Sequence, residues 1–185
     1  MKQAGFTIIE LLMVIAIITI LPVVVLSNFP QVKLQFALSR SAHAFAQNVR
    51  KVQDLALSST PYKDSFNIVR PVGGYGIYVD INNLGNKKYI IYADALPANG
   101  QYDVADYVVV AVDLAASEPG VAIVGLNHVF LNKASINFSV PNAAASITQL
   151  DKNNTAVEII FALEKDPAKT KSVFVSTAGL VEIQN

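Results

Sequence analysis

Residues 5–21 read Gly-Phe-Thr-Ile-Ile-Glu-Leu-Leu-Met-Val-Ile-Ala-Ile-Ile-Thr-Ile-Leu, and the apolar run continues through Leu26. Glu10 is the single charged residue in this run. A carboxylate at the centre of a membrane costs roughly 2.5–3.5 kcal/mol, so an acid in an apolar segment is a candidate functional residue that needs a partner. The run has the length of a membrane-spanning helix, about 20 residues, and is too long for the core of a cleaved signal peptide.

The sequence itself offers a partner for Glu10. Cleavage after Gly5 would create a new α-amino group on Phe6, one helical turn before Glu10. The amine of a neighbouring subunit could then meet this carboxylate inside the membrane. Glu10 is therefore predicted to act in contacts between copies of the chain.

The residues around this junction resemble the class III leader of type IV pilins and pseudopilins, with Lys2, then Gly5-Phe6-Thr7, then Glu10-Leu11-Leu12. The resemblance implies cleavage between Gly5 and Phe6 by a prepilin peptidase, N-methylation of Phe6, and Glu10 as the residue that sets register during assembly. It implies other pilin subunits and an inner-membrane assembly platform as partners. It also implies a single pass through the bacterial inner membrane, with the head outside the cytoplasm, before entry into a filament.

An ordinary signal-anchor helix is the alternative, and it would make the chain a monomeric envelope or binding protein. The basic residues do not decide the orientation, because Lys2 precedes the helix while Lys33, Arg40, Arg50 and Lys51 follow it. Orientation therefore rests on the prepilin resemblance. Pro22 predicts a kink or local unwinding near residues 18–22.

The predicted cleavage site and two changes of sequence pattern divide the chain into four parts. These are a leader at residues 1–5, a transmembrane and assembly helix at 6–29, an amphipathic helix at 30–60 and a β-rich globular head at 61–185. In the amphipathic segment the apolar positions recur at spacings of four and three, namely Leu38, Ala42, Phe45, Val49, Val52 and Ala56. This stripe predicts a helix packed on a sheet.

Short β-branched segments fill the head and are separated by Gly, Pro, Asn or Asp. The predicted strands are 66–70, 75–81, 88–93, 107–114, 121–125, 136–140, 157–163, 172–176 and 180–183. Hairpin loops are predicted at 82–86 and 177–179, and the polar residues 142–154 are predicted to form the most mobile loop. One long N-terminal helix followed by an antiparallel sheet is an α+β arrangement, and the resemblance makes it a pilin-like fold.

Several features outside the leader resemble the H-type minor pseudopilins of type II secretion and the related FimT minor pilins. They are the end of the helix, Leu55-Ala56-Leu57-Ser58, an early strand, Gly74-Tyr75-Gly76-Ile77-Tyr78-Val79, and a closing hairpin at 173–181. Some FimT-type proteins bind DNA through arginines in that hairpin. Here Gly179-Leu180-Val181-Glu182 has no basic residue. From Pro61 onward the sequence has 9 Lys/Arg and 12 Asp/Glu, so this part of the chain is mildly acidic. No nucleic-acid partner is therefore expected.

Catalysis has few candidate residues. The chain has no cysteine and two histidines, His43 and His128, which are far apart in sequence, and no nucleophile motif surrounds a serine. We therefore expect no enzymatic activity and no cofactor.

Calcium is the alternative worth testing, since it would make the chain resemble calcium-binding major pseudopilins. Asp80, Asn82 and Asn83 offer oxygen ligands in one loop, and Asp103 and Asp106 do so in another. The first loop begins like an EF-hand but has Ile91 at the position of the bidentate glutamate, so a side-chain-capped hairpin turn is favoured. Gly73-Gly74-Tyr75-Gly76 is followed by strand residues, which favours a strand entry over a phosphate-binding loop.

Overall fold

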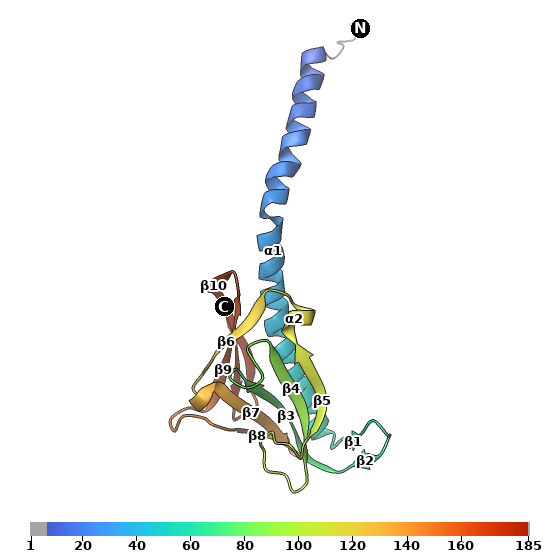
Figure 1. Cartoon of the computed structure of the whole chain (residues 1–185), viewed down its shortest axis with the longest axis vertical. Coiled ribbons are helices and arrows are strands. Elements are labelled where there is room, and N and C mark those ends of the chain that lie inside the picture. The colour runs from blue at the N-terminus through green and yellow to red at the C-terminus, as the bar shows by residue number, and fades with distance from the viewer. Residues whose placement is uncertain (1–6, 185) are drawn as a thin grey trace. The chain divides into compact units, whose positions relative to one another are not determined.

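A computed structural model describes residues 7–184 of the chain, without the side chains of residues 24–28. The chain divides into two compact units, Met1–Phe36 and Ala37–Asn185. Helix α1 (Ile8–Leu57) begins in the first unit and ends in the second. Figure 1 shows this helix preceding a region built of strands, so the chain has the predicted α+β architecture.

The first unit consists of the apolar part of α1. The chain stays helical through Pro22 and Pro30, so of the predicted kink or local unwinding near residues 18–22 the unwinding is wrong, and the kink stays a prediction. A proline removes one N–H donor from the helix, and the turns on either side keep their own hydrogen bonds.

In the second unit α1 is amphipathic. All six residues of the predicted apolar stripe are buried, while Arg40, His43, Gln47, Arg50 and Lys51 are exposed on the opposite side. Helix α1 ends at Leu57. The hydroxyl of Ser58, the next residue, donates a hydrogen bond to the carbonyl of Asp54 at 2.7 Å. The prediction of an amphipathic helix is therefore confirmed.

The strands form two main antiparallel sheets and a small hairpin. The hairpin pairs β1 (Tyr62–Lys63) with β2 (Val69–Arg70). The larger sheet has the order β5-β4-β3-β7-β8, from β5 (Tyr107–Asp113), β4 (Lys88–Ala95), β3 (Val72–Asp80), β7 (Lys133–Ser139) and β8 (Ala144–Ile147). The smaller sheet has the order β11-β10-β9-β6, from β11 (Val181–Gln184), β10 (Asp166–Ser176), β9 (Ala156–Leu163) and β6 (Val121–Asn127). Helix α2 (Leu114–Ser117) and the 3-10 turn η1 (Phe130–Asn132) join strands.

The core of the second unit lies where α1 meets both sheets. The ring of Phe45 is 5.1 Å from that of Tyr89 in β4 and 5.6 Å from that of Phe161 in β9. Asn48 donates to the hydroxyl of Tyr89 at 2.8 Å, and Gln53 donates to the carbonyl of Gly179 at 2.6 Å. One helix face therefore joins sheets that come from different parts of the sequence.

Two local predictions need correction. Residues 142–154, predicted to form a mobile loop, contain strand β8 and a bridge between Val129 and Leu150. Alanine and serine are poor strand markers, and pairing with β7 decides this segment. Residues 66–70 form a strand only over Val69–Arg70 because Asp64 accepts from the N–H groups of Phe66 and Ile68 and folds the chain into a turn.

The glycines of Gly74-Tyr75-Gly76 have a packing role within β3. A Cβ on Gly76 would lie 2.5 Å from the ring of Tyr92, and one on Gly74 would lie 2.6 Å from the Oδ1 of Asn137. The predicted strand entry is confirmed, but its glycines admit side chains from both neighbouring strands.

Candidate functional site

The N-terminal turn of α1 forms a reciprocal capping box between Thr7 and Glu10. The backbone N–H and the hydroxyl of Thr7 both donate to the Oε2 of Glu10 at 3.2 Å. The N–H of Glu10 donates to the Oγ1 of Thr7 at 3.3 Å. This arrangement satisfies N–H groups that the first turn of a helix would otherwise leave unpaired.

The capping box gives Glu10 a local role that the sequence reasoning missed. The signal was present as a threonine followed three residues later by glutamate ahead of an apolar run. A carboxylate is also favoured at a helix N-terminus by the helix dipole. The predicted cleavage and methylation residues, Gly5 and Phe6, lie outside the described residues.

The apolar side chains that follow are exposed within the isolated chain. Residues 7–23 are all exposed, and Ile8 reaches 81% of its full accessible area. A continuous exposed apolar surface of this kind marks a segment whose partners lie outside the chain. Over the described residues, no helix is both long enough and apolar enough to cross a membrane.

The candidate calcium ligand Asp80 is buried and already hydrogen-bonded at both oxygens. Oδ1 accepts from the N–H groups of Asn82 and Asn83 at 3.0 and 2.9 Å. Oδ2 accepts from the Tyr78 hydroxyl at 2.6 Å and from the Asn83 amide at 2.8 Å. Burial acts to raise the pKa of Asp80, but these hydrogen bonds outweigh it and hold the pKa below its usual range. These are the bonds of a side-chain-capped turn.

The second acidic loop, after β4, is held together in the same way. Asp94 is buried and accepts from the N–H of Gly100 at 2.8 Å and from the amide of Asn137 at 3.1 Å. Asp106 accepts from the N–H groups of Ala95 and Asp103, both at 2.9 Å. Burial raises the pKa of Asp106. Among the described side chains, no three His, Asp or Glu residues lie close enough to hold a metal ion.

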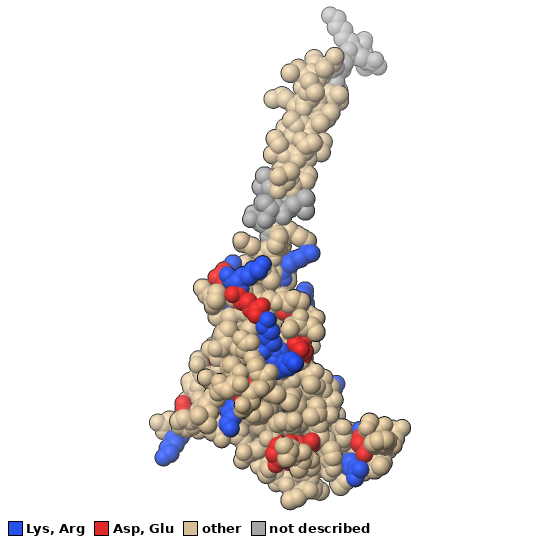
Figure 2. Space-filling view, viewed as in Figure 1, with Lys and Arg blue, Asp and Glu red and all other residues tan. Residues whose placement is uncertain are grey.

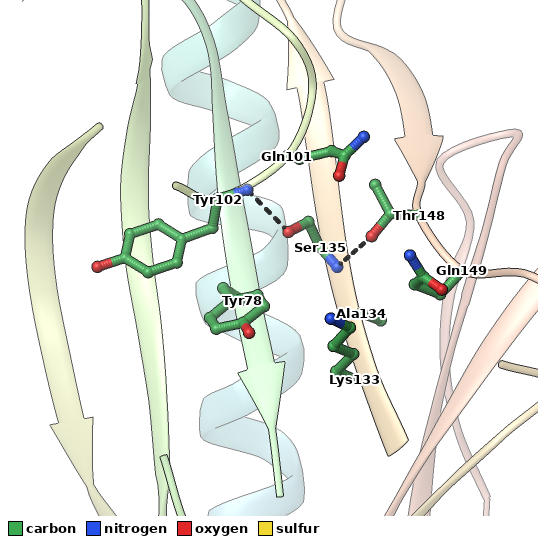
Figure 3. A pocket seen from close by; sticks show the side chains of 8 residues that line it. All are labelled: Tyr78, Gln101, Tyr102, Lys133, Ala134, Ser135, Thr148 and Gln149. Carbon is green, nitrogen blue, oxygen red and sulfur yellow. Dashed lines mark hydrogen bonds between the residues drawn. The ribbon is translucent and has the colours of Figure 1, made fainter. Parts of the chain in front are cut away.

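A small polar pocket lies beside this loop on the outer side of the larger sheet (Figure 3). Its volume is about 70 Å³, which suits a few water molecules and is small beside the roughly 300–1,000 Å³ of drug-sized ligand sites. Ser135 accepts from the N–H of Tyr102 at 3.0 Å, and its own N–H donates to the Oγ1 of Thr148 at 2.8 Å. The other lining residues are Tyr78, Gln101, Lys133, Ala134 and Gln149. The bonds inside this pocket fix the loop to the sheet.

The two histidines are both exposed, His43 on α1 and His128 in the turn after β6. Several charged groups of the second unit form ion pairs, visible in Figure 2 as adjoining blue and red atoms. Arg40 binds Glu118 through two bonds of 2.7 Å, and Lys87 lies 2.6 Å from Glu164.

Comparison with known proteins adds one finding at the N-terminus. Residues 1–21 match the prokaryotic N-terminal methylation motif. The chain carries the N-terminus of a type IV pilin-like prepilin. The motif indicates processing by a prepilin peptidase, pilin subunits as partners, and a membrane-anchored protein of the envelope. The match covers only the first part of this prepilin-like chain, and no curated protein and no solved structure matches it.

Proposed function

We propose that the chain is a minor structural subunit of a type IV pilus or a type II secretion pseudopilus and that it has no enzymatic activity. The observation that carries the proposal is the capping box of Thr7 and Glu10 inside the N-terminal methylation motif. It places a held carboxylate one turn after the predicted cleavage site, at the start of an exposed apolar helix.

The capping box would survive processing. All its donors and acceptors belong to Thr7 and Glu10, which follow the Gly5–Phe6 junction. Two of the three bonds end on the Oε2 of Glu10 and the third ends on the Oγ1 of Thr7, so Oε1 lies outside the box. In the proposed assembly this oxygen accepts from the Phe6 amine of the next subunit. A charge-assisted bond in apolar surroundings is strong and strict in its geometry, so it can fix register between helices.

The exposed apolar part of α1 supports the same function. Before assembly we propose that it anchors the chain in the inner membrane as a single pass, with the second unit outside the cytoplasm. An assembly platform then transfers it into the filament, where helices of other subunits replace the lipid. The helix loses no apolar contacts in this exchange, because packed side chains and hydrocarbon are similar environments.

Mass spectrometry of the mature N-terminus tests this proposal directly. We expect a chain that begins at Phe6 and carries an additional methyl group. Gly5→Arg is expected to block cleavage, and Glu10→Val is expected to permit cleavage and membrane insertion but to block assembly. An N-terminus at Met1, or normal filaments formed by both variants, would exclude the proposal.

The minor, H-type assignment is the finer part of the proposal. The residues that carry the resemblance occupy β3 and the closing hairpin β10–β11. Quantitative mass spectrometry of purified filaments is expected to give far fewer copies of this chain than of the main subunit. Equal or greater abundance would indicate a major subunit instead.

The alternatives make different predictions. A monomeric signal-anchored protein would keep its N-terminus and would form no helix-to-helix crosslinks. A calcium-stabilised major pseudopilin would lose thermal stability on chelation. The hydrogen bonds that occupy both oxygens of Asp80 favour the proposed subunit over the second alternative.

A further inference from the structure

Strand β5 (Tyr107–Asp113) is an edge of the larger sheet, with β4 as its neighbour on one side. It reads Tyr-Val-Val-Val-Ala-Val-Asp and contains no proline and no basic residue. Edge strands usually carry lysine, proline or inward-pointing charges, because their unpaired peptide groups are templates for another strand. Six consecutive uncharged residues, five of them Tyr or Val of high β-propensity, therefore make β5 a receptive edge.

The pairing with β4 shows which peptide groups face outward. The N–H of Leu114 donates to the carbonyl of Lys87 at 2.7 Å, directly after the Asp113–Lys88 pair. Hydrogen-bonded and non-bonded pairs alternate along antiparallel strands. Val112 and Val110 therefore bond to β4, and Ala111 directs its N–H and carbonyl away from it.

The side chains along this edge are apolar and accessible. Val108 and Val110 are 44% and 42% exposed, and Ala111 is exposed between Val110 and Val112. The ladder is irregular at Val109, which is a local bulge between the pairs Val110–Ile91 and Val108–Tyr92. Beyond this bulge the strand is regular and open from Val110 onward.

The β1–β2 hairpin extends the apolar surface from the first end of β5. The ring of Tyr62 stacks on that of Tyr107 at 4.9 Å, and its hydroxyl lies 3.5 Å from the carbonyl of Val108. The hairpin also exposes Phe66 at 83% of its accessible area, together with Val69. Figure 1 shows the hairpin projecting beside the sheet.

The charges at the ends of β5 argue against a second copy of the strand as its partner. Asp106 precedes the strand and Asp113 closes it. Full antiparallel overlap of two copies would set Asp113 of each copy beside Asp106 of the other, and like charges across a strand pair are destabilising. Lys88 of β4 lies 3.5 Å from Asp113 and offsets part of its charge, whereas β5 has no basic residue to offset Asp106. The edge fits an unlike strand with basic ends.

We propose that β5 binds an extended segment of another protein, which adds to the sheet beside it. The segment has about five β-branched residues, apolar at alternate positions and flanked by Lys or Arg, as expected for recognition by strand addition. Main-chain bonds to Ala111 supply affinity, and contacts with Val108 and Val110 select the side chains. This inference concerns the second unit and does not depend on the proposed function.

Hydrogen exchange on the full-length protein in detergent tests the proposal. The probe is a synthetic peptide, acetyl-Lys-Val-Thr-Val-Thr-Val-Lys-amide. We expect its addition to slow exchange of the Ala111 amide at least tenfold, whereas the same peptide N-methylated at alternate residues has no effect. An Ala111 exchange rate that the first peptide leaves unchanged would overturn the proposal.

Variants of the edge supply the matched controls. Ala111→Pro removes the outward N–H and no bond to β4, so it is expected to fold and to abolish peptide binding. Should this variant be unfolded, Ala111→Lys tests the edge by charge repulsion. Ala144→Lys, on the opposite edge strand β8, is expected to bind the peptide as the parent chain does. Equal binding by both Ala111 variants and the parent chain would contradict the proposal.

Sedimentation of the same samples without peptide distinguishes the other occupant. We expect the parent chain and Ala111→Lys to have the same oligomeric state. A dimer of the parent chain that Ala111→Lys dissociates would assign the edge to a second copy and would overturn the proposal.

Discussion

Thr7 and Glu10 satisfy each other's hydrogen-bonding groups at the point where the apolar helix begins. A lone carboxylate and unpaired N–H groups are each costly in apolar surroundings, and the capping box removes part of both costs. The box also fixes the direction of the carboxylate. At this scale Glu10 is a helix-capping residue first, and its proposed role between subunits depends on that geometry.

Thr7→Ala is expected to reduce filament assembly while leaving cleavage intact, because Glu10 loses a hydroxyl donor and its own N–H loses an acceptor. The loss of such a cap costs roughly 0.5–2 kcal/mol. The sheared filament fraction measures the effect, and Thr7→Ser is the matched control that should assemble normally. Assembly that is unaffected by Thr7→Ala would separate the capping box from register.

Gly76→Ala is expected to destabilise the second unit by roughly 1–3 kcal/mol, the usual cost of overpacking. The added methyl group would lie 2.5 Å from the ring of Tyr92. Gly125→Ala is the control, because its nearest neighbour would lie at 3.8 Å. Urea unfolding followed by tyrosine near-ultraviolet circular dichroism compares them. Equal midpoints for the two variants would contradict the close approach at Gly76.

The Asp80 carboxylate is expected to contribute stability that depends on pH. Its pKa is lower in the folded state than in the unfolded chain, where it is about 3.9. The contribution is therefore complete above that value and is lost as the pH falls through the folded-state pKa. Asp80→Asn is expected to flatten the stability curve below about pH 4. Asp54→Asn, on the exposed face of α1, is the control, and identical acid unfolding profiles for Asp80→Asn and the parent chain would refute this account.

At the scale of elements, the second half of α1 organises the core. Its buried face contacts β4 through Tyr89 and β9 through Phe161. Its polar contacts reach the last hairpin, where Gln53 binds the carbonyl of Gly179. A helix that contacts both sheets in this way stabilises both. It also holds together strands that are far apart in the sequence, such as β4 and β9.

Phe45→Ala is expected to cost roughly 3–5 kcal/mol, as is typical when a buried aromatic ring leaves a cavity. Phe45 is fully buried between rings of both sheets. Gln47→Ala, two residues along and exposed, should change stability little. Thermal and urea unfolding of the detergent-solubilised protein give the comparison. A small effect of Phe45→Ala would show that the sheets do not depend on this contact.

At the scale of the whole molecule, the chain separates an apolar helical unit from a unit that has a closed core. In the second unit the buried polar side chains all have hydrogen-bond partners among the described residues. This completeness suits a stable structural part. The exposed residues 8–23 and the edge strand β5 are the two surfaces that we propose contact other proteins.

Chelation is expected to leave the melting temperature of the full-length protein unchanged. The reason is that the oxygens of Asp80 and Asp106 already accept hydrogen bonds within their own loops. Differential scanning calorimetry with EDTA, and then with excess calcium, checks this expectation. A clear fall in melting temperature that calcium restores would establish the calcium-stabilised alternative.

Much of the fold could be predicted because it follows from local pattern. The apolar stripe from Leu38 to Ala56, most strands of the two main sheets and both hairpin turns were predicted from period and turn residues. Strand β8 was missed because Ala144–Ile147 carries little strand propensity and depends on pairing with β7. The capping box could have been found from Thr7 and Glu10 alone, since its bonds are confined to one helical turn.

The sequence by itself determined the prepilin-type N-terminus, the helix, the alternation of the strands and the acidic character of the head, because each depends on residues close together in the chain. Only the tertiary structure decided which strands are edges, why Gly74 and Gly76 must be small, and which rings pack around Phe45. Those properties arise from segments far apart in the sequence, such as β3 against β7 and α1 against β9. Their contacts are set by packing, which no local pattern encodes.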